Sequence, residues 1–120
     1  MNIEGTRTTP SIQIKPGRIE IRGRSIPEDS FEFYNPITHA IQDYFKKNHD
    51  KTEMHFHLEY INSGSKKFIT TILIDCNDLY QSGNNISVQW HYDADDEAIE
   101  ELGNDLRTML QIPFHLIKVG

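Results

Sequence analysis

The sequence has only one cysteine, Cys76, so it cannot form an internal disulfide. It also has no apolar run of about 18 residues or more, the length that crosses a bilayer. Residues 1–10 lack the apolar region of a signal peptide. These absences exclude a disulfide scaffold and a membrane partner, and they predict a cytoplasmic protein. The length of 120 residues predicts one domain over residues 1–120.

Clustered basic residues are missing as well. The chain has 12 Lys and Arg against 18 Asp and Glu, which gives a formal net charge of −6. Nucleic acid is therefore excluded as a partner, because binding to its phosphates needs grouped basic side chains. The charge favours a protein partner or a small cation. Seven acids between Asp93 and Asp105 are interpreted as the solvated face of a helix.

Motifs for catalysis are scarce. The seven glycines are dispersed, so no phosphate-binding loop of the Walker or dinucleotide type is present. Ser63 lacks the glycine two residues before it that a nucleophile elbow requires. Cys76 lies on the apolar stripe of a predicted helix and is expected to be a buried small hydrophobe. No cofactor and no catalytic residue are predicted.

Alternating and helical apolar patterns divide the chain into short elements. Alternation predicts strands at 11–15, 18–22, 53–60, 86–92 and 114–118, the first two joined by Pro16-Gly17. Three- and four-residue spacing predicts helices from Asn35-Pro36 to about Asn48, from about 63 to 81, and after residues 93–96. Residues 1–9 are expected to be loosely ordered, and residues 23–30 to form a surface loop held by the aromatics that follow.

This order of elements predicts an α/β fold that borders on α+β. An N-terminal hairpin is followed by successive strand–helix–strand units, whose right-handed crossovers imply a mixed, mostly parallel sheet. The strands alternate instead of being apolar throughout, so the helices are expected to cover mainly one face of the sheet.

Residues 60–67 (YINSGSKK) lie at the corner between a strand and a helix. Asn62, Ser63 and Ser65 all have side chains that can cap a first helical turn, and Gly64 permits a tight corner. One interpretation is simply a capped helix. The other is a hydroxyl that is chemically modified, since a phosphate here would lie at the positive end of the helix dipole.

His55 and His57 share one face of their strand, and His91 lies on the strand expected beside it. Two histidines two residues apart can converge on one metal ion. The alternative hypothesis is therefore a small metal-dependent or carboxylate-using enzyme with its site on the His55, His57 and His91 face. A solvated sheet face is the simpler interpretation.

Four segments in order resemble the SiaC-type regulatory phosphoproteins, small bacterial proteins. They are residues 23–36 (GRSIPEDSFEFYNP), residues 60–67, residues 90–93 (WHYD) with the acidic helix after them, and residues 112–114 (IPF). The resemblance covers nearly the whole chain. It implies a fold similar to the STAS domains of anti-sigma-factor antagonists and a role in partner switching.

The resemblance also implies a site and partners. Members are phosphorylated at the strand-to-helix corner by a cognate serine/threonine kinase, and a PP2C-type phosphatase removes the phosphate. In the branch that controls biofilm formation, the unphosphorylated form binds and activates a diguanylate cyclase. Ser63 matches the phosphorylated position, with Ser65 as the second choice. The expected partner-binding residues are those around it: Tyr60, Asn62, Gly64, Ser65 and Lys67.

Overall fold

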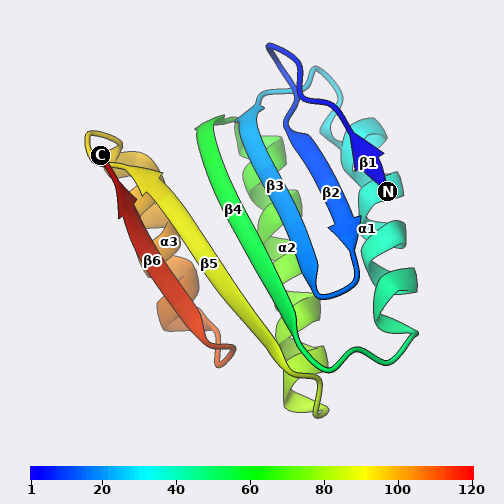
Figure 1. The fold of residues 1–120 in the computed structure, drawn as a ribbon. Coiled ribbons are helices and arrows are strands. Elements are labelled where there is room, and N and C mark those ends of the chain that lie inside the picture. The colour runs from blue at the N-terminus through cyan, green and yellow to red at the C-terminus, as the bar shows by residue number, and fades with distance from the viewer.

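The protein, described here over residues 1–120 by a computed structural model, is built on one six-stranded sheet with three helices (Figure 1). The strands follow one another across the sheet in the order β1-β2-β3-β4-β5-β6. The elements are β1 (Asn2–Ile3), β2 (Ser11–Lys15), β3 (Arg18–Ser25), α1 (Ser30–Phe45), β4 (Thr52–Ile61), α2 (Ser63–Gln81), β5 (Ile86–Asp93), α3 (Glu97–Met109) and β6 (Phe114–Val119).

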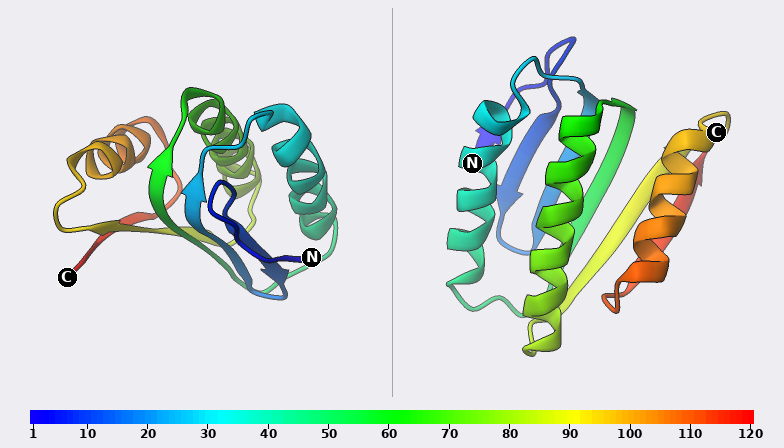
Figure 2. Two further views of the ribbon diagram at one scale, coloured as in Figure 1. Left: turned by 90° about the horizontal axis from the view of Figure 1, so that it is seen from above. Right: turned by 180° about the vertical axis from the view of Figure 1, so that it is seen from behind.

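The sheet is mixed. Strands β1, β2 and β3 pair antiparallel, whereas β3 to β6 are parallel neighbours, each joined to the next by one helix. All three helices lie on the same face, and the opposite face is uncovered (Figure 2). The predicted order from the hairpin onward, the mostly parallel sheet and the one-sided helical layer are therefore confirmed. None of the helices combines the length and the apolar composition that a membrane crossing requires.

The core lies between this helical layer and the sheet. Met54, Phe56 and Leu58 on β4 point into it and are at most 1% exposed, as the alternation predicted. Trp90 on β5 is fully buried, and its indole Nε1–H donates to Ile99 O of α3 at 3.0 Å. Cys76 lies in the same core, and burial raises the pKa of its thiol to about 12. The cysteine is therefore an inert apolar side chain, as expected.

The N-terminal residues differ from the prediction. Residues 1–9 were expected to be loose, but Asn2 and Ile3 form β1, with Ile3 opposite Ile12 of β2. The Met1 ammonium group also donates to Ile14 O at 3.3 Å. A two-residue strand has too short a pattern to be recognised in sequence, and its position depends on the edge that β2 offers.

The start of α1 also differs from the prediction. Gly23 to Ser25 continue β3 instead of forming a loop, and α1 begins at Ser30, several residues before Asn35. Asp29 is the N-cap, and its Oδ1 accepts from Glu32 N at 3.0 Å. Pro36 consequently lies inside the helix. The early start brings Tyr34 into the core with no exposed surface, and this burial outweighs the local preference of proline for a first turn.

The parallel strands bring three helix starts to one edge of the sheet. β3, β4 and β5 all end there, and α1, α2 and α3 begin just beyond them. The segment 60–67 lies at the middle of this edge, between the starts of α1 and α3 (Figure 2).

Candidate functional site

The corner between β4 and α2 is held by a single residue, Asn62. Its Oδ1 accepts from Ser65 N at 2.9 Å, which makes it the N-cap of α2. Its Nδ2 donates to Pro27 O at 3.1 Å, and its backbone N–H donates to Ser25 O at 3.1 Å. Asn62 therefore fixes the corner to the end of β3, and neither serine hydroxyl is needed as the cap.

The two serines of the corner lie in opposite environments. Ser63, the first residue of α2, is exposed to solvent. Ser65 has no exposed surface, and its Oγ makes no hydrogen bond. It lies beside Tyr34, whose hydroxyl hydrogen-bonds Ser25 Oγ. Burial raises the pKa of Tyr34, and the hydrogen bond with the Ser25 hydroxyl acts in the opposite direction, so the tyrosine stays neutral.

The other residues that were predicted to contact a partner lie around the same corner. Tyr60 is 58% exposed, and the Arg24 guanidinium lies 5.2 Å from the centroid of its ring. Lys67 is exposed one turn into α2. Gly64 faces the first residue of α1, because a Cβ added to it would overlap Ser30 Oγ. Tyr60, Asn62, Gly64 and Lys67 are thus together at the corner, whereas Ser65 points into the protein.

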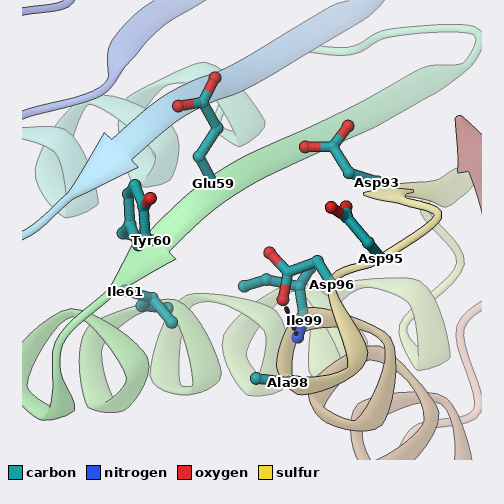
Figure 3. A pocket seen from close by; sticks show the side chains of 8 residues that line it. All are labelled: Glu59, Tyr60, Ile61, Asp93, Asp95, Asp96, Ala98 and Ile99. Atoms are coloured by element: carbon teal, nitrogen blue, oxygen red, sulfur yellow. Dashed lines mark hydrogen bonds between the residues drawn. The ribbon is translucent and has the colours of Figure 1, made fainter. Parts of the chain in front are cut away.

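A pocket opens beside the corner, between the end of β4 and the start of α3 (Figure 3). Its volume is about 550 Å³. It is lined by Glu59, Tyr60, Ile61, Asp93, Asp95, Asp96, Ala98 and Ile99. The interpretation of the acidic run as one solvated helix face was incomplete, because its first three members lie before α3 and line this pocket. Asp96 is also the N-cap, with its Oδ1 accepting from Ile99 N at 3.1 Å.

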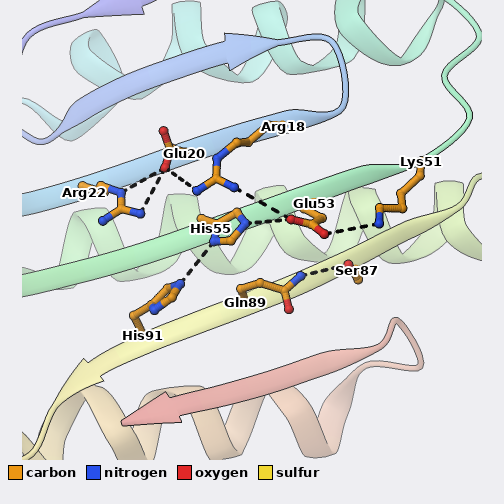
Figure 4. Close-up of polar contacts among 9 residues, drawn as sticks. All are labelled: Arg18, Glu20, Arg22, Lys51, Glu53, His55, Ser87, Gln89 and His91. Atoms are coloured by element: carbon orange, nitrogen blue, oxygen red, sulfur yellow. Dashed lines mark hydrogen bonds and ion pairs between the residues drawn. The ribbon is translucent and has the colours of Figure 1, made fainter. Parts of the chain in front are cut away.

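Polar side chains cover the open face of the sheet (Figure 4). His55 is 9% exposed; its Nε2 donates to Glu53 Oε1 at 3.1 Å, and its Nδ1 lies 3.2 Å from His91 Nε2. His57 Nε2 donates to Asp93 Oδ1 at 3.1 Å. Burial lowers the pKa of His91, and the positive charges of His55, Arg22, His57 and Arg18 lower it further.

The side chains of the histidine face are not arranged to hold a metal ion. Nowhere in the chain are three or more His, Cys, Asp or Glu side chains placed to hold a metal ion. His55 and His57 instead each pair with a carboxylate. The structure thus gives the alternative hypothesis of a metal-dependent enzyme no metal site. Sequence reasoning missed the arginines that join this face, although Arg18, Glu20 and Arg22 alternate along β3. Glu20 Oε1 accepts from both arginines, at 2.9 and 3.1 Å.

The fold is that of a small mixed α/β domain with an exposed serine at the start of α2. The chain belongs to the SiaC family of regulatory phosphoproteins, whose model matches residues 3–119. This match confirms the resemblance found in the sequence. The family is one of regulators, and its members are not enzymes.

Proteins of Pseudomonas aeruginosa are similar over nearly the full length. A protein of strain UCBPP-PA14 is 31% identical over 116 residues, which span 95% of this chain and 92% of the relative. One solved structure contains SiaC in complex with the diguanylate cyclase SiaD, of which SiaC is the activator. The present chain matches it with a TM-score of 0.92 at 30% identity, and the match covers 99% of both chains. A second structure of SiaC from Pseudomonas aeruginosa has a TM-score of 0.91 at 29% identity, covering 99% of this chain and 98% of the other.

Proposed function

We propose that this protein is a partner-switching regulator that is reversibly phosphorylated on Ser63. In this proposal a serine/threonine kinase adds the phosphate, a PP2C-type phosphatase removes it, and the phosphorylation state controls binding to a signalling enzyme in the cytoplasm. A diguanylate cyclase is the leading candidate for that enzyme, because the related SiaC is found in complex with SiaD. The observation that carries the proposal is the exposure of Ser63 beside a buried Ser65.

The fold can accept a phosphate at Ser63 without rearranging. The side chain is exposed, and Asn62 already caps α2, so no hydrogen bond that holds the corner involves the Ser63 hydroxyl. The positive end of the α2 dipole favours added negative charge at its first residue. At Ser65 the same group would have to enter the core.

The phosphate would change binding more than it changes folding. A dianion on Ser63 would have to lose its water when a partner covers the corner, and it would repel acidic groups of that partner. Unpaired interfacial charges typically cost about 2 to 5 kcal/mol, which is sufficient for a switch. Tyr60, Asn62, Gly64 and Lys67 surround Ser63 and are the proposed partner contacts; the buried Ser65 is excluded from this set.

The phosphorylation site can be tested with purified kinases of the source organism. Incubation with the cognate kinase should add one phosphate that peptide mass spectrometry assigns to Ser63. Ser63→Ala should abolish the mass shift, and Ser65→Ala, the matched control at the buried serine, should retain it. Phosphate on another residue, with Ser63→Ala modified normally, would contradict the assignment.

Phosphate mimicry tests the switch separately. Ser63→Asp should lose binding to the partner cyclase, and Ser63→Ala should keep it, because only the aspartate adds charge to the corner. The measurement is the dissociation constant of each variant with the purified cyclase. Equal affinities of the two variants would exclude a charge-based switch at this position.

A further inference from the structure

A second pocket lies at the opposite edge of the sheet from Ser63, where α1 ends and the chain turns between β2 and β3 (Figure 1). Its volume is about 310 Å³. We call it the hairpin pocket, and its main walls are residues 14–16 of the hairpin and Ala40, Asp43, Tyr44 and Lys47 at the end of α1. Sites for small molecules typically measure about 300 to 1,000 Å³, so this pocket has room for a ligand of one ring or a short chain.

Hydrogen bonds hold the two sides of the hairpin pocket together. The Tyr44 hydroxyl accepts from Gly17 N at 2.9 Å and hydrogen-bonds Thr52 Oγ1 at 2.7 Å, so the tyrosine ties α1 to the turn of the hairpin. The His49 ring stacks on the Tyr44 ring, with 3.8 Å between centroids and 6° between planes. His49 Nε2 also donates to Tyr44 O at 2.8 Å. The pocket is therefore formed before a ligand arrives, which reduces the entropy lost on binding.

Part of the pocket wall is apolar. Met1, Ile14 and Ala40 line it, and Met1 is held in place because Ile14 N donates to Met1 O at 2.9 Å. The space depends on the small side chain of Ala40, since a larger one at this position of α1 would extend into the pocket. Such a wall favours a ligand with an apolar body, which is removed from water on binding.

The charges of the hairpin pocket are basic, in a protein whose net charge is −6. Lys15 and Lys47 line it, are exposed, and form no ion pair within the chain. Asp43 is the only acid of the lining, and Lys46 Nζ already pairs with its carboxylate at 3.1 Å. The following residues, 46–51, contain three lysines and one acid, Asp50. A negatively charged group is therefore attracted to this pocket.

The end of α1 does not reverse this attraction. A helix carries partial negative charge at its last carbonyl groups. Here Tyr44 O accepts from Lys47 N as well as from His49 Nε2, and Asp43 O accepts from Lys46 N. These carbonyl groups are thus already hydrogen-bonded.

We propose that the hairpin pocket binds a small carboxylate with an apolar body. The apolar wall formed by Ile14 and Ala40 receives the ring or chain of the ligand, and Lys15 and Lys47 bind its carboxylate. The site lies at the other edge of the sheet from Ser63 and does not depend on phosphorylation. The proposed switch therefore stands or fails independently of it.

Other occupants fit the hairpin pocket less well. Exposed ion pairs contribute little by themselves, so an inorganic anion would gain too little from the two lysines. A neutral ligand would leave both lysines without a partner. In a two-fold contact between copies, Lys15 and Lys47 of one subunit would lie near the same lysines of the other, and like charges disfavour association.

Three probes test the chemistry of the site by two-dimensional NMR of the full chain. 3-Phenylpropionate should shift the amide signals of Ile14, Ala40 and Lys47 in a saturable way, with a dissociation constant of about 1 mM or lower. 3-Phenylpropanamide has the same shape without the charge and should bind about fivefold more weakly or worse. Acetate has the charge without the apolar body and should not saturate up to about 20 mM.

Variants test the location. Ala40→Leu should abolish binding of 3-phenylpropionate because it fills the pocket, and Lys15→Gln and Lys47→Gln should each weaken it about twofold to fivefold. Ala98→Leu makes the same size change at the pocket beside α3, and Lys118→Gln makes the same charge change on β6. Both controls should bind as the wild type does, and urea midpoints report whether each variant is folded.

Several results would overturn the inference. Absence of saturable shifts with 3-phenylpropionate would remove the site. Equal binding of the amide would exclude recognition of the carboxylate, and equal binding of acetate would exclude the apolar contact. Normal binding by a folded Ala40→Leu variant would place the ligand elsewhere. If Ala40→Leu does not fold, normal binding by both lysine variants would contradict the same assignment.

Discussion

At the scale of single residues, the sequence located the corner between β4 and α2 but did not distinguish the roles of its three polar residues. Asn62, Ser63 and Ser65 are all good capping residues, so their order alone left the cap and the phosphorylated residue open. The structure assigns the cap to Asn62 and buries Ser65 completely. Which of two serines faces the core depends on how α2 packs against Tyr34 of α1, a contact between residues far apart in sequence that no local pattern encodes.

The burial of Ser65 predicts how substitutions will affect stability. Ser65→Ala removes a buried hydroxyl that has no hydrogen-bond partner, so the free energy of unfolding should fall by less than about 1 kcal/mol or rise. Ser65→Asp places a carboxylate in the same closed space and should destabilise by several times that amount. Urea denaturation measures both. An unfolding free energy of Ser65→Asp close to that of the wild type would show that Ser65 is accessible.

At the scale of helices and strands, patterns predicted the interiors better than the ends. Burial repeats regularly along each element. The apolar stripes of α2 and α3 and the apolar alternation of β4 and β5 could therefore be recognised in the sequence. The predicted start of α1 was wrong because Asp29 and Asn35 are both suitable N-caps. Which of them caps the helix depends on the burial of Tyr34. The acidic pocket was missed because its residues come from β4, β5, the turn before α3 and the first turn of that helix.

Helix α3 packs so closely against the sheet that a side chain at position 103 would displace its neighbours. A Cβ there would overlap the ring of Trp90, which is held by its hydrogen bond to Ile99 O, and Leu116 Cδ2. Gly103→Ala should therefore lower the free energy of unfolding by about 1 to 3 kcal/mol. This loss should exceed the gain in helix propensity of about 1 kcal/mol.

The control is Glu101→Ala on the exposed side of the same helix, which should change stability by no more than about 0.5 kcal/mol. Urea denaturation followed by Trp90 fluorescence measures both variants. A stable Gly103→Ala protein with unchanged fluorescence would show that α3 packs less tightly than the structure indicates.

The open face of the sheet should make stability depend on pH through His91. Its pKa in the folded protein is below the ordinary value of 6.5, so the unfolded chain binds a proton more readily. The contribution of His91 to stability is therefore present above pH 6.5 and is lost as the pH falls through the lower folded pKa. The urea midpoint should decrease between about pH 7.5 and pH 5.5, and His91→Gln should decrease less. Equal decreases in both proteins would exclude this role for His91.

At the scale of the whole molecule, the order of the elements was sufficient to predict most of the fold. Successive strand–helix–strand units with right-handed crossovers determine which face the helices cover, and the structure has all three helices on that one face (Figure 2). The same topology brings three helix starts to one edge, so Ser63 and the acidic pocket become neighbours. Their separate sequence segments did not reveal this proximity.

In the proposed switch, phosphate on Ser63 releases a partner without unfolding the domain. The most direct test compares one purified sample before and after stoichiometric phosphorylation by the cognate kinase, and again after treatment with a PP2C-type phosphatase. We predict tight binding to the cyclase, then a loss of affinity of about thirtyfold or more, then recovery, with unchanged circular dichroism throughout. An affinity that does not change when Ser63 is fully phosphorylated would contradict the account.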